Sequence, residues 1–246
     1  MEDLFHESIR WPPQSSIVVE TSDHCSMILQ TPILKHRWPL FRNDQDSALA
    51  LVQTLTKDQL KSILLYIYSD LPAKGSMSHT FELCQLSHPL SLQQSTFVED
   101  MRNLMHDDET SDFELVAEQG HVRVHRCILA ARSRYFRSLF LTESSETISG
   151  FWQCHRPIPL KTLQFFVEYL YTGQISVPET VDIIPLCWMV KYLRLSGEKE
   201  VENIIVSAMT RNLCDETQDL FFEIATQWDA QCVIDVIEKH KSTKGV

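Results

Sequence analysis

Cysteine and histidine side chains are the first candidates for chemistry in this sequence. The seven cysteines are odd in number and widely spaced, and no two of them form a Cys-x-x-Cys pair. The ten histidines do not complete the ligand spacing of a zinc site. We therefore expect no metal, and most cysteines should be buried, reduced thiols, as is typical of cytoplasmic or nuclear proteins. The cysteines are Cys25, Cys84, Cys127, Cys154, Cys187, Cys214 and Cys232.

Catalytic motifs are the second possibility. Serine, histidine and carboxylate side chains are plentiful, but none lies in the sequence context of a nucleophile elbow or a phosphate-binding loop. Only six glycines occur, which disfavours glycine-rich nucleotide loops. His125 is the strongest single candidate for a general base, yet no partner motif accompanies it. The sequence predicts a protein that is not an enzyme and binds no cofactor.

Composition narrows the choice of partners. The 246 residues are enough for two compact domains, and 43% apolar with 22% charged residues indicates a folded chain. A formal charge of −11 argues against nonspecific binding of nucleic acid, which requires a basic surface. Residues 1–20 lack the apolar core of a signal peptide, and no window approaches 18 uninterrupted apolar residues. We expect neither nucleic acid nor membrane as a partner.

The stretch from Val124 to Phe140 carries the clearest structural pattern. Its apolar residues recur at helical spacing and form one face, whereas three arginines point away from that face. This pattern predicts one amphipathic core helix. Asp112–Val116 reads as a strand followed by a hairpin, so that His125 and Arg126 stand at the entrance of the helix. The apolar face consists of Ile128, Leu129, Tyr135, Phe136, Leu139 and Phe140; the arginines are Arg132, Arg134 and Arg137.

This order of residues resembles the BTB/POZ domain family. The family signature is a strand starting with Asp, a hairpin, His-Arg, an aliphatic pair, two small residues, Ser, Tyr-Phe and Leu-Phe, and nearly every element is present. Tyr169-Leu170-Tyr171-Thr172-Gly173 is a second hallmark of the family. The resemblance implies a helix-rich α+β fold, a small mixed sheet covered by helices. It also implies a structural role for His125 and Arg126.

The first third of the chain repeats parts of this pattern. Residues 33–42 match residues 128–137 at an offset of 95 (128 − 33), and residues 60–69 match 163–172 at an offset of 103 (163 − 60). Two matches in the same order predict an internal duplication, in which residues 16–90 form a degenerate BTB-like domain. Chance similarity between amphipathic helices is the alternative. Pro39 lies inside the first helix, where it costs about 3 kcal/mol or forces a break.

The remaining elements complete a domain plan. We expect strands at Ser16–Glu20, Met27–Leu29 and Phe151–Gln153, and a helix from Leu160 that ends at Gly173. Further helices are expected at Thr80–Leu86, Val181–Leu195 and Glu200–Leu213, and Thr96 to Glu99 reads as a capping box. The plan is a lead-in at 1–15, a degenerate BTB-like domain at 16–90, a BTB/POZ domain at 91–212, and short helices at 213–246. That last segment resembles the beginning of the BACK helical extension that follows BTB domains.

The resemblance implies an adaptor that brings substrate to a cullin-3 ubiquitin ligase. Family adaptors dock the cullin through the loop after the Leu-Phe pair, often with a hydrophobic-x-Glu motif. Here that motif reads Ser144-Ser145-Glu146, so the glutamate is present and the apolar anchor is absent, with Leu141-Thr142-Glu143 as a shifted version. We expect residues 142–147 to be an exposed polar loop. The predicted partner-binding residues are Leu141, Glu143, Glu146 and Tyr192.

A second set of residues is predicted to mediate dimerisation. Phe97, Met101, Leu104 and Met105 form one apolar stripe at helical spacing. In the BTB proteins that this chain resembles, a helix at this position packs across a homodimer. The alternatives are packing on its own domain or against the first repeat. The alternative function is a scaffold without a cullin, acting through homo- or hetero-assembly in signalling or transcriptional regulation.

Overall fold

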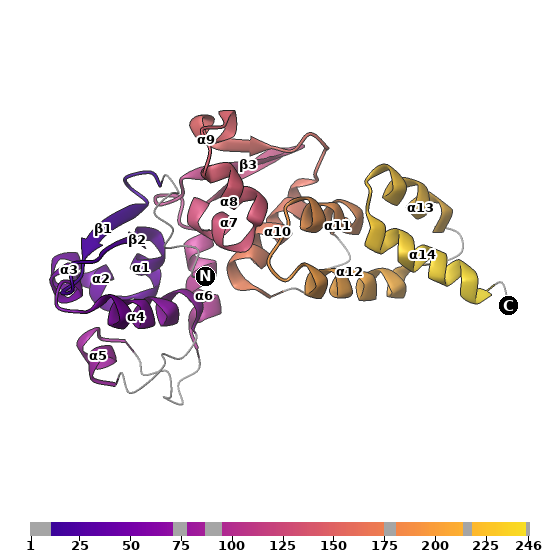
Figure 1. Cartoon of the computed structure of the whole chain (residues 1–246). Helices are drawn as coiled ribbons and strands as arrows, with labels where there is room; N and C mark the ends of the chain where they lie inside the picture. Colours follow the sequence, from indigo (N-terminus) through magenta and orange to yellow (C-terminus); the bar gives the residue numbers. More distant parts are fainter. Residues whose placement is uncertain (1–10, 71–77, 87–94, 175–180, 214–217, 245–246) are drawn as a thin grey trace.

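Figure 1 shows the computed structural model of the chain, which describes residues 11–70, 78–86, 95–174, 181–213 and 218–244. Within these residues the chain forms two small sheets and many short helices, the helix-rich α+β architecture that was expected. For convenience, residues 11–86 are called the first unit, residues 95–212 the second unit and residues 218–244 the tail.

The first unit begins with a hairpin. Strands β1 (Ser16–Glu20) and β2 (Ser26–Gln30) pair antiparallel, which confirms both predicted strands. The helices that follow are α1 (Thr31–Arg37), α2 (Pro39–Asn43), α3 (Gln45–Val52), α4 (Lys57–Ser69) and α5 (Ser78–Leu83). Pro39 is the first residue of α2, and Trp38 before it has extended backbone angles. Proline therefore breaks the helix here, as the sequence predicts.

The second unit has a three-stranded sheet in the order β4-β3-β5, and β5 runs parallel to β3. Its strands are β3 (Phe113–Ala117), β4 (Gly120–Val124) and β5 (Phe151–Gln153). Its helices are α6 (Phe97–Met105), α7 (Arg126–Arg132), α8 (Arg134–Phe140), α9 (Ser145–Ser149), α10 (Leu160–Thr172), α11 (Ile183–Tyr192) and α12 (Glu198–Asn212). Helix α10 ends at Gly173, whose φ of 69° fits the predicted glycine cap.

The single helix predicted around Phe136 is wrong, because the stretch is divided into α7 and α8 at Ser133. Ser133 has φ −133° and ψ 123°, and its hydroxyl donates to the Leu193 carbonyl at 2.6 Å. The same oxygen accepts from the Phe136 N–H and so caps α8. Ser133 also forms an isolated antiparallel β-bridge with Leu195, which holds its backbone extended. The break is thus imposed by a segment 60 residues further along the chain.

Tyrosine hydroxyls hold the helix entrances of both units in the same way. The Tyr171 hydroxyl accepts the backbone N–H of His125 at 2.9 Å, immediately before α7. The Tyr68 hydroxyl accepts the backbone N–H of Gln30 at 3.0 Å, immediately before α1. These pairs reproduce the two sequence offsets, 95 (125 − 30) and 103 (171 − 68). Equivalent contacts therefore link equivalent positions of the two units.

Arginine side chains repeat the correspondence. Arg37 Nε donates to the Ile67 carbonyl at 3.0 Å, and Arg132 Nε donates to the Leu170 carbonyl at 3.0 Å. Each guanidinium also lies over the ring of a tyrosine on the helix that supplies the accepting carbonyl. Arg37 lies 5.9 Å from the Tyr66 ring, and Arg132 lies 5.8 Å from the Tyr169 ring. The two units also share the order of hairpin, two short helices one residue apart, a third short helix and a 13-residue helix, except that β5 precedes the last of these in the second unit.

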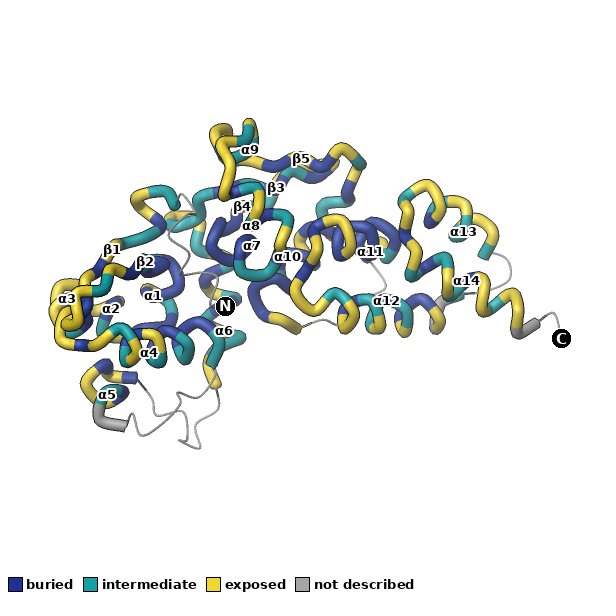
Figure 2. The backbone as a smooth tube through the Cα atoms, viewed as in Figure 1, coloured by how far each residue is buried: buried dark blue, intermediate teal, exposed yellow. Residues whose placement is uncertain are grey.

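Helix α6 is the part of the second unit that faces the first, and it contacts both α1 and α10. The capping box predicted at its N-terminus is wrong, because the Thr96 hydroxyl donates to Asp100 Oδ2 at 2.8 Å and does not cap the backbone. Arg37 of the first unit binds Asp100 at 2.9 Å, and His36 binds Asp107 at 3.0 Å. Buried segments occur in both units, on either side of α6 (Figure 2). The two units consequently share one apolar core.

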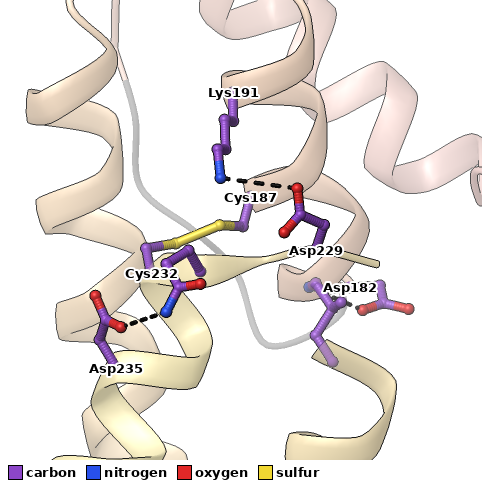
Figure 3. The surroundings of a disulfide bond; sticks show 8 residues. Asp182, Cys187, Lys191, Asp229, Cys232 and Asp235 are labelled. Atoms are coloured by element: carbon purple, nitrogen blue, oxygen red, sulfur yellow. Dashed lines mark hydrogen bonds and ion pairs between the residues drawn. A yellow bond between two sulfur atoms is a disulfide. The ribbon is translucent and has the colours of Figure 1, made fainter. Parts of the chain in front are cut away.

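The tail consists of α13 (Gln218–Gln227) and α14 (Gln231–Lys244), which pack on each other. Helix α14 also contacts α11 and α12, so the tail is attached to the second unit. A disulfide joins Cys187 of α11 to Cys232 of α14 (Figure 3). These two cysteines depart from the expected reduced thiols, because helix packing brings together residues 45 positions apart. Cys84, Cys127 and Cys154 are buried free thiols, as expected.

Candidate interaction surface

The segment after α8 is partly helical, and the predicted loop at residues 142–147 is wrong in this respect. Ser144 accepts a hydrogen bond from the Thr147 N–H at 3.2 Å and caps α9. The Thr147 hydroxyl donates to the Leu139 carbonyl, and the Thr147 carbonyl accepts from Arg126. These bonds fix α9 against the end of α8. Ser144, at the position where the family resemblance implies an apolar anchor, therefore has a local structural role.

The predicted partner-binding residues gather around this short helix. Leu141 caps the end of α8 with 46% of its surface exposed, and Glu143 is also exposed. Glu146 lies in the first turn of α9, where hydrogen bonds from its own backbone N–H and the Ser145 hydroxyl lower the pKa of its carboxyl. Tyr192 ends α11 and is 37% exposed. Burial raises the pKa of the Tyr192 phenol, the neighbouring Tyr135 adds to this, and the Glu146 carboxylate makes the smallest contribution.

Two apolar residues of this surface were missed by sequence reasoning. Ile148 on α9 is 78% exposed, and Phe151 at the start of β5 is 43% exposed. Ile148 lies four positions after Ser144, so it places an apolar side chain one helical turn beyond the missing anchor. The sequence signal was a lone isoleucine in a polar stretch, and that stretch is held as a helix by the cap at Ser144 and by the bonds of Thr147 with Leu139 and Arg126.

A groove of about 880 Å³ lies beside this surface, between α8 and α11. Its aromatic wall is continuous: the Trp188 and Tyr192 rings stack at 4.5 Å, and Tyr192 lies 5.3 Å from Tyr135. The Tyr135 hydroxyl accepts the indole N–H of Trp152 at 3.1 Å, which anchors the wall to β5. Positive side chains line the groove as well, namely Arg134, Lys191 and Arg194.

The tail borders this groove. Arg156 lies over the rings of Trp188 and Trp228, at 5.6 and 5.2 Å, and donates to the Gln227 carbonyl. Lys191 pairs with Asp229 at 3.8 Å, as Figure 3 shows. One side of the groove is therefore positioned by contacts between the second unit and the tail.

Comparison with known proteins identifies the second unit. Residues 101–207 match the model of the BTB/POZ domain. This segment is a BTB/POZ domain.

Curated proteins with the same domain are similar over parts of the chain. They include Regulatory protein NPR3 of Arabidopsis thaliana, 28% identical over 59% of this chain and 28% of the relative. BTB/POZ domain-containing protein 9 of Drosophila melanogaster is 31% identical over 36% of this chain and 13% of the relative. Kelch-like protein 8 of Caenorhabditis elegans is 26% identical over 68% of this chain and 24% of the relative. The chain thus spans less than a third of the length of these relatives.

His125 occupies the entrance of α7 in the BTB/POZ domain and is 1% exposed. Its Nδ1 is 2.7 Å from the Tyr171 hydroxyl, and its Nε2 is 2.9 Å from the Thr110 hydroxyl. Burial lowers the pKa of His125 to about 4, so the imidazole is neutral at pH 7. Both ring nitrogens are engaged in holding the fold, which is the structural role that the family resemblance implies.

The residues predicted to mediate dimerisation lie on α6 and not on the surface around Leu141. Met101 and Leu104 are buried, and Phe97 and Met105 are half-buried. The guanidinium of Arg37 covers the Phe97 ring at 5.0 Å. The first unit thus covers part of this stripe, as one of the sequence alternatives expects.

Among the described residues, no group of histidine, cysteine and carboxylate side chains is arranged to hold a metal ion. None of the helices in the described ranges combines the length and apolar character needed to cross a bilayer.

Proposed function

We propose that this chain is a protein-interaction adaptor that docks cullin-3 through its BTB/POZ domain and brings a substrate to the ligase. The observation that carries the proposal is the exposure of four large apolar side chains, at the end of α8, on α9, on β5 and at the end of α11. Helix α9 contacts both α8 and β5, and Tyr192 of α11 lies against Tyr135 of α8. Apolar and aromatic anchors contribute most of the energy of a protein interface. The four residues are Leu141, Ile148, Phe151 and Tyr192.

Ile148 is the anchor in this proposal. The family's hydrophobic-x-Glu motif lacks its apolar member here, but Ile148 is the most exposed large apolar side chain among the described residues. It follows Glu146 on the same short helix, whose C-terminus at Gly150 adopts a φ of 81°. A cap at each end holds the isoleucine in a defined position, which lowers the entropic cost of docking.

The first unit is proposed to be a degenerate BTB-like copy. Equivalent tyrosine and arginine contacts at the offsets 95 and 103 support this duplication. Because the first unit packs on α6, it occupies part of the face that the resemblance assigns to a homodimer partner. In an adaptor, the outer surface of the first unit is then the place for substrate.

Calorimetry with the cullin-3 N-terminal domain tests the docking proposal. Ile148→Asp and Leu141→Asp should each weaken binding by about tenfold or more, since each places a charge in a desolvated contact. Val18→Asp is a matched control, because Val18 is 68% exposed but lies on β1 of the first unit. Tight binding of the wild-type chain that neither BTB/POZ variant weakens would move the site elsewhere.

The scaffold without a cullin remains the second candidate, favoured by the replacement of the family's apolar anchor by Ser144, which caps α9. Absence of any binding of the wild-type chain to cullin-3 in the same titration would support it. Sedimentation of the full chain across a concentration series then distinguishes a scaffold that assembles with itself from one that requires a different partner.

A further inference from the structure

A second groove, which shares no residue with the one beside Trp188, lies among α6, β4 and α10. Its volume is about 710 Å³. The half-buried apolar side chains in its lining, here called its floor, include those of Met105, Val122 and Phe165. Apolar floors of this kind accommodate an aromatic or aliphatic side chain of a ligand.

Positive and imidazole side chains surround this floor. Arg102, Arg123 and Lys161 line the groove together with His106 and His121. Asp108 and Glu168 also line it, but Glu168 is already paired with Arg102 at 3.2 Å. The groove is thus lined by more cations than carboxylates, although the whole chain has a formal charge of −11.

Two of the cations have no acidic partner among the described residues. Arg123 is exposed, and its guanidinium makes one long contact of 3.5 Å with the Ser111 carbonyl. Lys161 is exposed in the first turn of α10, a turn that contains no acidic residue. Both cations therefore have free donors for a carboxylate, and the start of α10 adds the positive end of a helix dipole.

The groove also runs along the edge of the sheet. Side chains alternate between the two faces of a strand, so a groove on one face would be lined by every second residue. Here three consecutive residues, His121, Val122 and Arg123, line it. Strand β4 is the outer strand of the order β4-β3-β5, with β3 as its neighbour in the described part of the chain. Edge strands offer backbone donors and acceptors to an added strand.

We propose that this groove binds an extended acidic segment of another protein, in which carboxylates flank an aromatic or aliphatic side chain. The carboxylates bind Arg123 and Lys161, the apolar side chain lies on Met105 and Phe165, and the segment runs beside β4. The occupant is a protein segment because apolar floor and strand edge act together. A membrane surface would use the cations without the edge.

Fluorescence anisotropy of the full chain with a labelled peptide tests this proposal. The probe is a peptide of roughly ten residues, the upper end of usual strand lengths, with alternating glutamate and valine around a central phenylalanine. A second peptide carries glutamine in place of each glutamate. The acidic peptide should bind, the glutamine peptide should bind about tenfold more weakly or not at all, and added salt should weaken the acidic complex.

Charge reversal in the groove locates the binding. Lys161→Glu and Arg123→Glu should each weaken binding of the acidic peptide by about tenfold, whereas Lys161→Arg should retain the wild-type affinity. Lys61→Glu is the matched control, because Lys61 is exposed on α4 and does not line the groove. Melting curves confirm that the variants are folded.

Three results would overturn the proposal. Equal affinity for the acidic and glutamine peptides would exclude recognition of charge. Equal effects of Lys161→Glu and Lys61→Glu would exclude this groove. Binding of anionic phosphatidylserine vesicles with no binding of the acidic peptide would assign the cations to a lipid surface. None of these results depends on cullin-3, so the two proposals stand or fall separately.

Discussion

Gln30 and His125 occupy equivalent positions in the two units, immediately before the first helix after the hairpin. Each donates its backbone N–H to a tyrosine hydroxyl. In the BTB/POZ domain, both ring nitrogens of His125 have hydrogen-bonding partners. In the first unit, the amide nitrogen and oxygen of the fully buried Gln30 find none among the described residues. The backbone contact is common to both units, whereas the side-chain network exists in only one.

Arg37 and Arg132, which make equivalent hydrogen bonds in the two units, differ in their ion pairs. Here the side chain with more partners belongs to the first unit. Arg37 binds the carboxylates of Asp70 at 2.7 Å and Asp100 at 2.9 Å, and Asp100 belongs to α6. Arg132 has no carboxylate within ion-pair distance in the described ranges and borders a cavity of about 540 Å³. The arginine of the first unit thus attaches α6, while its counterpart serves only its own domain. The difference teaches that ion pairs, and not the shared hydrogen bond to a helix carbonyl, attach the first unit to α6.

The largest expected effect concerns the aromatic cores of the two units. Phe136 is fully buried among the rings of Phe113, Phe140 and Trp152, so Phe136→Ala should destabilise the chain by about 3–5 kcal/mol. Phe41, at the equivalent position, has Trp38 beside it, and Phe41→Ala should cost less. Urea denaturation measures both, with the exposed Arg134→Ala as a control. If Phe41→Ala lowered the free energy of unfolding more than Phe136→Ala, the first unit and not the BTB/POZ domain would have the more tightly packed aromatic core.

The next effect is pH-dependent and confined to one unit. In the unfolded chain His125 takes up a proton near pH 6.5, but burial delays this in the folded chain until about pH 4. Between these values the unfolded chain binds more protons, so stability should fall on acidification, by up to about 3 kcal/mol. His125→Gln copies the first unit and should remove this component of the pH dependence. If the free energies of unfolding of the wild-type chain and of His125→Gln fell in parallel from pH 7 to pH 4, this role of His125 would be contradicted.

The third effect concerns the contact between units. Arg37→Ala should cost about 2 kcal/mol, because the two carboxylates lose their cation but remain partly exposed to water. Arg132→Ala should cost about 1 kcal/mol, since it removes a hydrogen bond to a carbonyl without leaving a charge unpaired. Chemical denaturation of both variants gives the comparison. Equal losses would mean that the ion pairs with α6 add nothing to the attachment.

The smallest effect should be a gain. Gln30→Met replaces a buried amide without partners by an apolar side chain of similar length, and should stabilise the chain by about 1 kcal/mol. His125→Met should destabilise it, because the Thr110 and Tyr171 hydroxyls lose a buried partner. Melting temperatures of the two variants test the contrast. Similar losses for both would mean that Gln30 is as well satisfied as His125.

The sequence alone determined what depends on neighbouring residues. Residues rich in β-branched side chains marked the strands of the first hairpin, Pro39 marked the break between α1 and α2, and Gly173 marked the end of α10. The signature around His125 and Tyr171 was enough to recognise the BTB/POZ domain. Local sterics, backbone propensity and a recurring motif act over a few positions, so they can be read without knowing the rest of the fold.

The tertiary structure decided what depends on distant residues. The Leu193 carbonyl divides the central helix at Ser133, and Arg126 with Leu139 fixes the α9 turn that exposes Ile148. Packing of the first unit on α6 decides which apolar residues are covered, and packing of the tail brings Cys187 to Cys232. Hydrogen bonds and apolar contacts between segments far apart in the chain outweigh local preference at these positions, and no local pattern records them.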